Sequence, residues 1–167
     1  MKHTISVLVE NHAGVLSRIS GLFTRRGFNI DSLAVGVTDD PDISRITIIV
    51  TCDEHMTEQV EKQLNKLIEV LKVKTIPDEE LIARELMIVK LSADAAARRD
   101  ILTVAEVMEA KILDITPTTL TLQLADVPQQ LERFVQLVEP YGILEIARTG
   151  TIALQKGSDT LSFRGKV

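Results

Sequence analysis

The sequence predicts an α+β protein built from two ferredoxin-like domains, each with the element order βαββαβ. Short runs with every second residue apolar alternate with runs of helical apolar spacing. The resulting order of elements occurs twice along the chain, with hardly any residue identity between the copies. The charged break PDEE at residues 77–80 separates them. The predicted organisation is an N-terminal domain at 1–77, a linker at 78–84, a C-terminal domain at 85–155 and a tail at 156–167.

The first copy begins with a strand whose apolar face is Ile5, Val7 and Val9. From Val15 the apolar spacing becomes helical, and Gly27 is a typical residue to end that helix. The expected elements are a strand at 5–9, a helix at 15–26, strands at 28–37 and 45–52 around a turn at 38–42, a helix whose apolar stripe covers 56–71, and a strand at 70–76.

The second copy repeats this order after the break. Its clearest strand has Leu120, Leu122 and Leu124 on one face, and Asp126 is a suitable N-cap for the helix that follows. The expected elements are a strand at 85–91, a helix at 94–110, strands at 111–116 and 119–125, a helix from 127 to the PYG stop at 140–142, and a last strand at 143–149. The tail from 156 has no periodicity, and we expect it to be loosely attached.

A βαββαβ unit places both helices on one face of a four-stranded antiparallel sheet. The other face and the edge strand then need cover, or they invite association. Leu8 and Ile49 point to the face opposite their apolar neighbours, which indicates a second apolar layer. We therefore expect a homodimer.

The composition limits the function classes. The 167 residues are 45% hydrophobic but only 3% aromatic, so the core is aliphatic. A net charge of −5 and a pI near 5.2 argue against a nucleic-acid partner or an anionic membrane surface. One cysteine, Cys52, excludes an intrachain disulfide. The N-terminus starts a strand rather than a signal peptide, and no apolar run approaches a membrane span, so we expect a cytoplasmic protein.

Few residues offer catalytic chemistry. The histidines His3, His12 and His55 lack metal-ligand spacing to one another or to Cys52, so no metal site is predicted. Cys52 ends an apolar strand face and is expected in the core. Four glutamates are interpreted as the solvated face of the second helix: Glu54, Glu58, Glu61 and Glu69.

Two functions of ferredoxin-like proteins fit poorly. An RNA-recognition module needs aromatic residues for base stacking, and the strands at 5–9 and 45–52 have none. An acylphosphatase-like enzyme would need an arginine in the first strand–helix loop to hold phosphate. That loop is Asn-His-Ala-Gly at 11–14, and the nearest arginine, Arg18, lies within the helix.

The same loop suits a small amino acid. A glycine turn that leads into a helix leaves backbone N–H groups without partners, here those of Ala13, Gly14 and Val15, and these can bind a carboxylate. The amide oxygen of Asn11 can accept from the ammonium group. A side chain at Gly14 would crowd the ligand or forbid a positive φ.

A second asparagine, Asn29, and the Ile30 backbone could close this site from a neighbouring subunit. The alternative is that Asn11 and Gly14 only make a good turn and that Asn29 only starts a strand.

The motif NxxGVLSRIxGLFxRRGFNIxSLxV at 11–35, followed by TDDP and SRITI, resembles the small, regulatory subunit of acetohydroxyacid (acetolactate) synthase. The resemblance is dense at 4–76 and looser afterwards, where ELMIVK, ILDITP and EIARTG fit the family. It implies an ACT domain at 1–77 and a second ferredoxin-like domain. By motif position it implies an effector site made of these residues: Asn11, His12, Ala13, Gly14, Val15, Leu16, Asn29 and Ile30. Only a backbone role carries over to His12 and Ala13.

The resemblance also implies a function without catalysis in this chain. Such a subunit binds the thiamine-diphosphate-dependent catalytic subunit, activates it and confers feedback inhibition by valine bound at an ACT dimer interface. The thiamine diphosphate, magnesium and FAD would belong to the catalytic partner, with no cofactor in this chain. Isoleucine and leucine stay alternatives to valine, because an aliphatic pocket separates one methylene by only about 1–3 kcal/mol. Two other hypotheses are a freestanding ACT-type sensor with a different partner and a small ferredoxin-like enzyme.

Overall fold

A computed structural model describes residues 1–163. The chain forms two compact units. The first contains residues 1–82 together with the described residues from 151 onward, and the second contains residues 83–150. Each unit has its own sheet and its own hydrophobic core, so each is described by itself.

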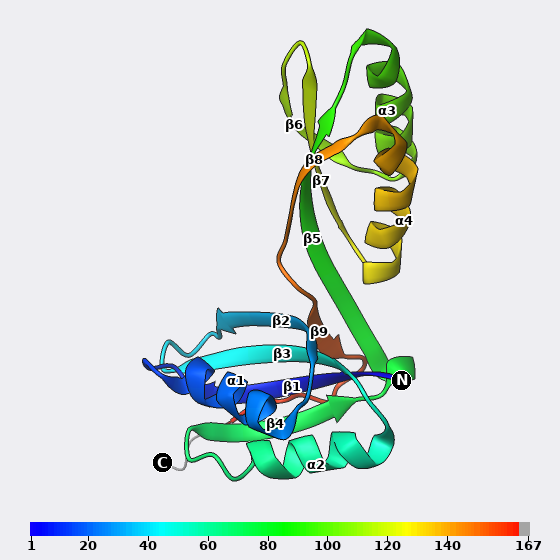
Figure 1. The fold of residues 1–167 in the computed structure, drawn as a ribbon. Coiled ribbons are helices and arrows are strands. Elements are labelled where there is room, and N and C mark those ends of the chain that lie inside the picture. Colours follow the sequence, from blue (N-terminus) through cyan, green and yellow to red (C-terminus); the bar gives the residue numbers. More distant parts are fainter. Residues whose placement is uncertain (164–167) are drawn as a thin grey trace. The chain divides into compact units, whose positions relative to one another are not determined.

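The first unit is a four-stranded antiparallel sheet of order β2-β3-β1-β4 with α1 and α2 on one face (Figure 1). Its elements are β1 (Lys2–Glu10), α1 (Val15–Arg26), β2 (Ile30–Val37), β3 (Ile43–Thr51), α2 (Glu54–Leu64) and β4 (Val70–Ile76). In the register of the central strands Ile5 lies opposite Ile48, and both are fully buried under the helices. The predicted βαββαβ order and α+β class are confirmed.

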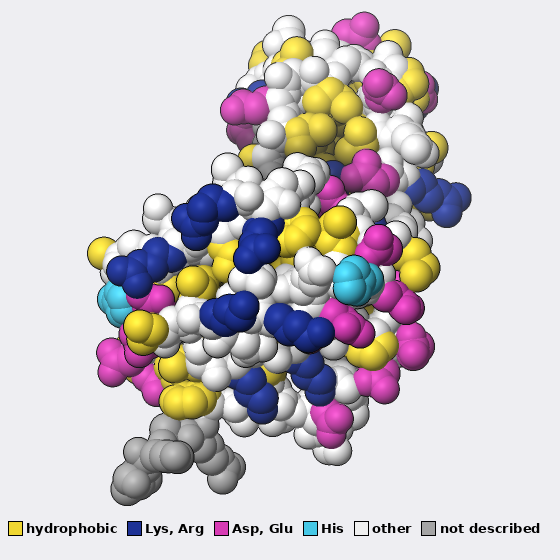
Figure 2. All heavy atoms as spheres, turned by 60° about the horizontal axis from the view of Figure 1, so that its bottom comes forward, with side chains coloured by type: hydrophobic (Ala, Val, Ile, Leu, Met, Phe, Trp, Pro, Cys, Tyr) yellow, Lys and Arg dark blue, Asp and Glu magenta, His cyan; other side chains and the backbone are white. Residues whose placement is uncertain are grey.

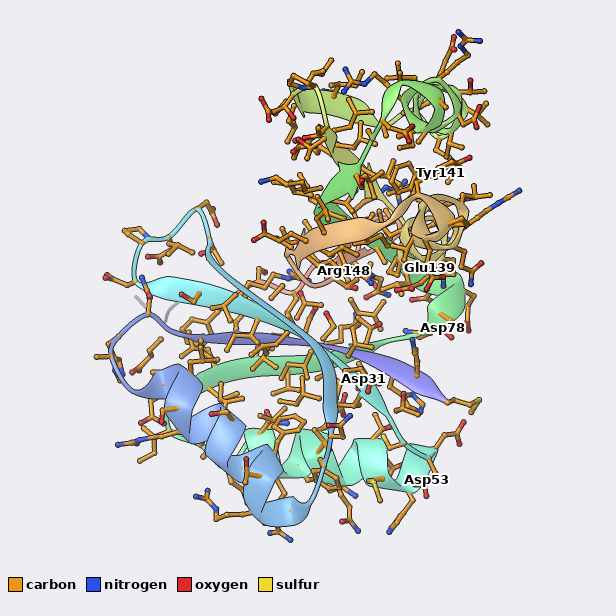
Figure 3. The ribbon with its side chains drawn as sticks, turned by 45° about the horizontal axis from the view of Figure 1, so that its top comes forward. Asp31, Asp53, Asp78, Glu139, Tyr141 and Arg148 are labelled. Atoms are coloured by element: carbon orange, nitrogen blue, oxygen red, sulfur yellow. The ribbon has the colours of Figure 1, made fainter. Side chains whose placement is uncertain are left out.

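The boundaries of the helices follow their capping residues. Gly27, at φ 69°, ends α1 in the left-handed conformation that glycine adopts without penalty. Asp53 begins α2 by accepting a hydrogen bond from the Met56 amide at 2.8 Å, and its position at the start of the helix is visible in Figure 3. Cys52 packs against the core as predicted, with Sγ 3.2 Å from the Thr57 hydroxyl.

Two predictions about the second helix are wrong. The helix ends at Leu64, and the predicted stripe residue Ile68 lies in the following turns with 88% of its surface exposed. Glu61 and Glu69 are not simply solvated: the Glu61 carboxylate accepts from the Thr75 amide at 2.7 Å, and Glu69 is buried. Because the helix ends at Leu64, helical spacing does not determine which way Glu69 points, and its side chain can be buried.

The second unit repeats the architecture with strand order β6-β7-β5-β8. Its elements are β5 (Leu81–Ser92), α3 (Ala95–Val107), β6 (Lys111–Ile115), β7 (Thr119–Asp126), α4 (Pro128–Val138), the short helix η2 (Glu139–Tyr141) and β8 (Ile143–Arg148). Leu120, Leu122 and Leu124 are buried on one face as predicted. The N-cap of α4 is Val127 rather than Asp126, whose carboxylate instead accepts from the Val127 amide at 2.6 Å.

The termini of the second unit are linked by a cluster of charged side chains. Arg148, labelled in Figure 3, places Nε 2.6 Å from the buried Glu85 carboxylate and Nη1 2.5 Å from Glu132. These carboxylates raise the pKa of Arg148, with the hydrogen bond to Glu85 as the larger cause. This arrangement ties β5 to β8 and α4.

The units differ from the predicted domain boundaries at both ends. The predicted linker at 78–84 contains a short helix, η1 (Asp78–Glu80), and the first residues of β5. Residues 151–156, which we call the return segment, lie in the first unit and contain β9 (Ile152–Gln155), which pairs with β5. The sequence does not predict the pairing of β9 with β5, because β9 is only four residues long and β5 is remote from it in sequence.

Several hydrogen bonds fasten the return segment to the first unit, among them the following three. The Thr151 amide donates to Ser32 Oγ at 2.9 Å, and the Arg45 guanidinium donates to the Ala153 carbonyl at 2.9 Å. The Lys156 amide donates to the Glu80 carbonyl at 2.7 Å. The predicted tail at 156–167 is therefore anchored at its first residue rather than loosely attached, and its last four residues lie outside the described part of the chain.

The return segment lies on the face of the sheet where the sequence predicts a second apolar layer. Leu8 and Ile49 are buried on the face of the sheet without helices. Ile49 pairs with Ser32 in the register of the sheet, and Leu8 pairs with Arg45. Since Ser32 and Arg45 are the residues that bind the return segment, this segment crosses the sheet beside Leu8 and Ile49.

Candidate functional site

The loop between β1 and α1 has the geometry of an anion-binding helix terminus. Gly14 is the N-cap of α1 with φ 91° and ψ −15°, and no side chain caps the helix. The first intrahelical bond runs from the Arg18 amide to the Gly14 carbonyl at 3.0 Å. The amides ahead of Arg18 therefore present the positive end of the helix dipole at the surface.

Gly14 is required for its conformation rather than for space within one chain. A Cβ added at Gly14 would meet no heavy atom within 4 Å, so the region beside it is open. A side chain at φ 91° would nevertheless be strained, because L-residues rarely adopt this conformation. Within one chain, Gly14 is therefore needed for its positive φ, and a side chain there could crowd only a ligand or a second chain.

Asn11 is held in place by the loop between β2 and β3. Its backbone amide donates to the Asp42 carbonyl at 2.8 Å, and its side-chain Nδ2 donates to the Pro41 carbonyl at 2.8 Å. With the nitrogen engaged, the side-chain oxygen is oriented and has no partner among residues 1–163. An oriented amide oxygen beside a helix N-terminus provides an acceptor for an ammonium group next to a carboxylate site.

His12 closes the outer side of the loop. Its Nε2 lies 3.0 Å from a Glu10 carboxylate oxygen, and its Nδ1 lies 3.1 Å from the Ala13 carbonyl. The hydrogen bond to Ala13, followed by that to Glu10, raises the pKa of His12. Val15 is buried in the core, so only its amide can reach a ligand, whereas Leu16 is exposed.

An ion pair that the sequence did not predict stabilises both sides of the loop at 11–14. The Arg18 guanidinium contacts the buried carboxylate of Glu69. The Glu69 carbonyl also accepts from the Glu10 amide at 2.9 Å. Glu69 therefore holds both the end of β1 and the first turns of α1. No local pattern indicates this role, because Arg18 is 51 residues from Glu69 in sequence.

Asn29 and Ile30 lie at the opposite end of the unit. Ile30 pairs with Val50 on β3, whereas Glu10, which precedes the loop, pairs with Ile43. Ile43 and Val50 are seven residue steps apart on β3, which is about 23 Å along a strand. The Asn29 side chain donates to Asp31 at 3.2 Å. The structure thus groups residues 11–16 and keeps Asn29 and Ile30 away from them within one chain.

Comparison with known proteins identifies the family. Residues 5–72 match the family model described as AHAS small subunit-like ACT domain, and residues 84–157 match the model described as small subunit of acetolactate synthase. This chain belongs to the acetolactate synthase small-subunit family. The ACT domain predicted for the first half is part of that match.

Individual relatives agree over nearly the whole chain. The acetolactate synthase small subunit of Mycolicibacterium smegmatis is 45% identical over 155 residues, covering 93% of this chain and 91% of that protein. The acetolactate synthase isozyme 3 small subunit of Salmonella typhimurium is 43% identical over 158 residues, covering 94% and 97%. The crystal structure of the Thermotoga maritima acetolactate synthase small subunit superposes with a TM-score of 0.89 at 35% identity, covering 95% and 99%.

Other classes of site receive no support from the described residues. Residues 1–163 contain no group of three or more His, Cys, Asp or Glu side chains placed to hold a metal ion. None of their helices has the length and apolarity needed to cross a bilayer. Figure 2 shows Lys and Arg side chains gathered on one face, with Asp and Glu side chains on both sides of them. The charges on this face are therefore mixed.

Proposed function

We propose that this chain is a regulatory subunit that binds the large catalytic subunit of acetolactate synthase, raises its activity and makes it sensitive to inhibition by valine. Membership of the small-subunit family over both halves of the chain supports this proposal. In this proposal the thiamine diphosphate, magnesium and FAD belong to the catalytic subunit. This chain contributes regulation and performs no catalytic step itself.

The loop at 11–14 carries the effector part of the proposal. The uncapped N-terminus of α1 provides amides for the valine carboxylate, and the Asn11 side-chain oxygen provides an acceptor for its ammonium group. A Cβ built on Gly14 would meet no heavy atom within 4 Å, so one chain leaves space open beside this loop. Leu16, exposed on the first turn of α1, offers an apolar contact for the isopropyl group.

We place the other half of the site on a second copy of the chain. β2 is an edge strand, and two of its apolar side chains, Val35 and Val37, are 48% and 59% exposed. Antiparallel pairing of two β2 strands about their centres would set Ile30 of one copy opposite Val37 of the other. Val37 leads directly into the loop that holds Asn11. A homodimer of this kind would bring Asn29 of the partner subunit to the loop at 11–14.

Regulation then follows from linkage between two binding equilibria. Valine bound across the dimer favours one arrangement of the two copies, and the catalytic subunit binds preferentially to the other arrangement, which activates it. A coupling free energy of about 1–3 kcal/mol gives roughly 5- to 150-fold modulation. The same coupling requires that binding of the catalytic subunit weakens valine binding by an equal factor.

Two measurements on the full chain test the proposal. The first is thermal unfolding with L-valine, D-valine or glycine, where L-valine at 100 times its Kd is expected to stabilise the fold by about 2.7 kcal/mol. The second is copurification with the large acetolactate synthase subunit. A stable complex together with a shift by L-valine alone supports the proposal. A shift without a complex favours a freestanding sensor, and the absence of both would refute it.

A further inference from the structure

A cavity lies on the helix-free face of the first sheet, away from the loop at 11–14. Its volume is about 300 Å³. Side chains of β1, β3 and β4 form its floor, and residues 154–161 cover it. Figure 1 shows β9 and the segment that follows it on the side of this sheet away from α1 and α2. The volume is at the lower end of the range of about 300–1,000 Å³ for small-molecule pockets.

The cavity contains a half-buried arginine without a counter-ion. Arg45 Nη2 donates to the Ser6 hydroxyl at 3.0 Å and to the Ala153 carbonyl at 2.9 Å, and both acceptors are neutral. Its Nε is buried and has no hydrogen-bond partner within residues 1–163. Burial lowers the pKa of Arg45. A desolvated cation without an anionic partner is costly, and a bound anion removes that cost.

A second cation and one carboxylate also line the cavity, together with the neutral polar side chains of Gln155 and Thr160. Lys74 is 33% exposed and its Nζ lies 4.0 Å from a carboxylate oxygen of Asp159, which is 70% exposed. A pair this long and this solvated is weak. With Arg45 and Lys74 against Asp159, the cavity keeps one positive charge in excess.

The cavity also has an aliphatic part in its lining. Ile76 is buried in β4, and Leu154 and Leu161 belong to the covering residues. A highly hydrated anion would leave these three side chains without a contact. A carboxylate with a short apolar body satisfies both parts of the lining.

We propose that this cavity binds a small aliphatic carboxylate, separately from the loop at 11–14. The carboxylate bonds to Arg45 with support from Lys74, and its hydrocarbon part packs against Ile76, Leu154 and Leu161. The ligand is either a simple acid or an amino acid whose ammonium group pairs with Asp159. Because residues 154–161 form one wall, binding also holds this part of the chain against the sheet.

Calorimetric titration of the full chain with 3-methylbutanoate tests the proposal, since this acid lacks the ammonium group that the loop at 11–14 would recognise. We expect saturable binding at one site per chain. Arg45→Met and Lys74→Met should each weaken it about tenfold or more, the loss expected for a hydrogen bond to a charged group. Lys72→Met is the matched control, because Lys72 lies on the same face of β4 but outside the cavity.

Lys74→Met removes a partly solvated side chain, so it tests the site even if Arg45→Met fails to fold. Inorganic phosphate is titrated in parallel. Binding of phosphate but not of 3-methylbutanoate would overturn the assignment to an aliphatic carboxylate, as would equal loss in Lys72→Met and Lys74→Met. A wild-type chain that binds neither anion would overturn the site itself.

Titration with L-valine distinguishes the two sources of the carboxylate. It is performed in Gly14→Asp, so that the loop at 11–14 does not contribute. Binding of L-valine tighter than that of 3-methylbutanoate assigns the ligand as an amino acid with Asp159 as its second partner. Tighter binding of 3-methylbutanoate assigns it as a simple acid.

Discussion

At the scale of single residues, Gly14 combines a left-handed backbone with open space in front of it. We expect Gly14→Asp to abolish inhibition by valine, because its carboxylate would repel the carboxylate of the ligand. The positive φ should also cost about 1–2 kcal/mol of the free energy of unfolding. Inhibition curves of the reconstituted enzyme measure the first effect.

Gly14→Ala is the matched control for this variant. It carries the same backbone strain without a charge, so it should lose similar stability and retain part of the inhibition. Full inhibition of an enzyme reconstituted with Gly14→Asp would show that valine does not bind at this loop.

Removal of either partner of the ion pair between Arg18 and Glu69 should destabilise the fold by a different amount. Arg18 is mostly exposed and Glu69 is buried. Glu69→Gln releases an arginine into solvent and should cost about 1 kcal/mol of the free energy of unfolding. Arg18→Met should cost more, because it leaves a buried carboxylate without its cation. Urea denaturation of the two variants gives the comparison, and equal costs would show that the Glu69 carboxylate is solvated.

His12 should give the loop a dependence on pH. Its folded-state pKa is raised, chiefly by the Ala13 carbonyl and then by Glu10. A raised pKa stabilises the folded state fully below the ordinary histidine value of about 6.5, and this contribution is lost as the pH rises through the folded-state value. An NMR titration of the His12 ring measures the folded-state pKa.

Glu10→Gln is the informative variant for that titration. The backbone bond to Ala13 is the larger cause of the raised pKa, so Glu10→Gln should lower the His12 pKa only part of the way. A return to the value of an unfolded peptide would assign the whole effect to the carboxylate.

Residue-level prediction from the sequence succeeded where the chemistry is local. The glycine turn at Gly14 and the helix start after it can be recognised from neighbouring residues, and both are present. The bond from Asn11 to Pro41 and the burial of Glu69 could not be recognised, because their partners are remote in sequence. Remote partners are decided by sheet register, which a single sequence does not display.

At the scale of elements, the return segment protects the helix-free face of the first sheet. Removal of residues 151–167 should expose Leu8 and Ile49, with a loss of up to about 1.5–3 kcal/mol for each side chain. Urea denaturation of the truncated chain measures this loss. Removal of residues 157–167 alone is the control, since it keeps the hydrogen bonds that residues 151–156 make to the first unit. Equal stability of the two truncations would contradict the assigned role.

The sequence predicted long elements well and short or interrupted ones poorly. The stripe from 56 to 71 looked like one helix, but the chain leaves the helix at Leu64 and Ile68 is exposed. β9 was missed because four residues carry too little periodicity to identify a strand. The alternation of apolar and polar residues at 119–125 was long enough to identify both the strand and its buried face.

At the scale of the whole molecule, a site shared between two copies predicts complementation. Gly14→Asp and Asn29→His should each abolish inhibition by valine when present in both copies. In a mixed dimer, the loop of the Asn29→His chain meets the intact Asn29 of the other chain, so one complete site forms. Mixing the two variants by unfolding and refolding them together should therefore restore partial inhibition.

Each variant refolded alone is the control for the mixing experiment. Persistent insensitivity of the mixture, with dimers verified by light scattering, would show that both residues act within one copy. This arrangement is difficult to reconcile with the strand register, which keeps the loop and Asn29 at opposite ends of β3.

The path of the chain through its two units also orders the events of its synthesis. Residues 83–150 are inserted between β4 and the return segment, which completes the first unit. At about 5–20 residues per second, a ribosome needs several seconds to make the insertion. During that interval the nascent N-terminal sheet has emerged without the segment that crosses beside Leu8 and Ile49. The newborn chain therefore passes through a stage in which this apolar face is open to chaperones.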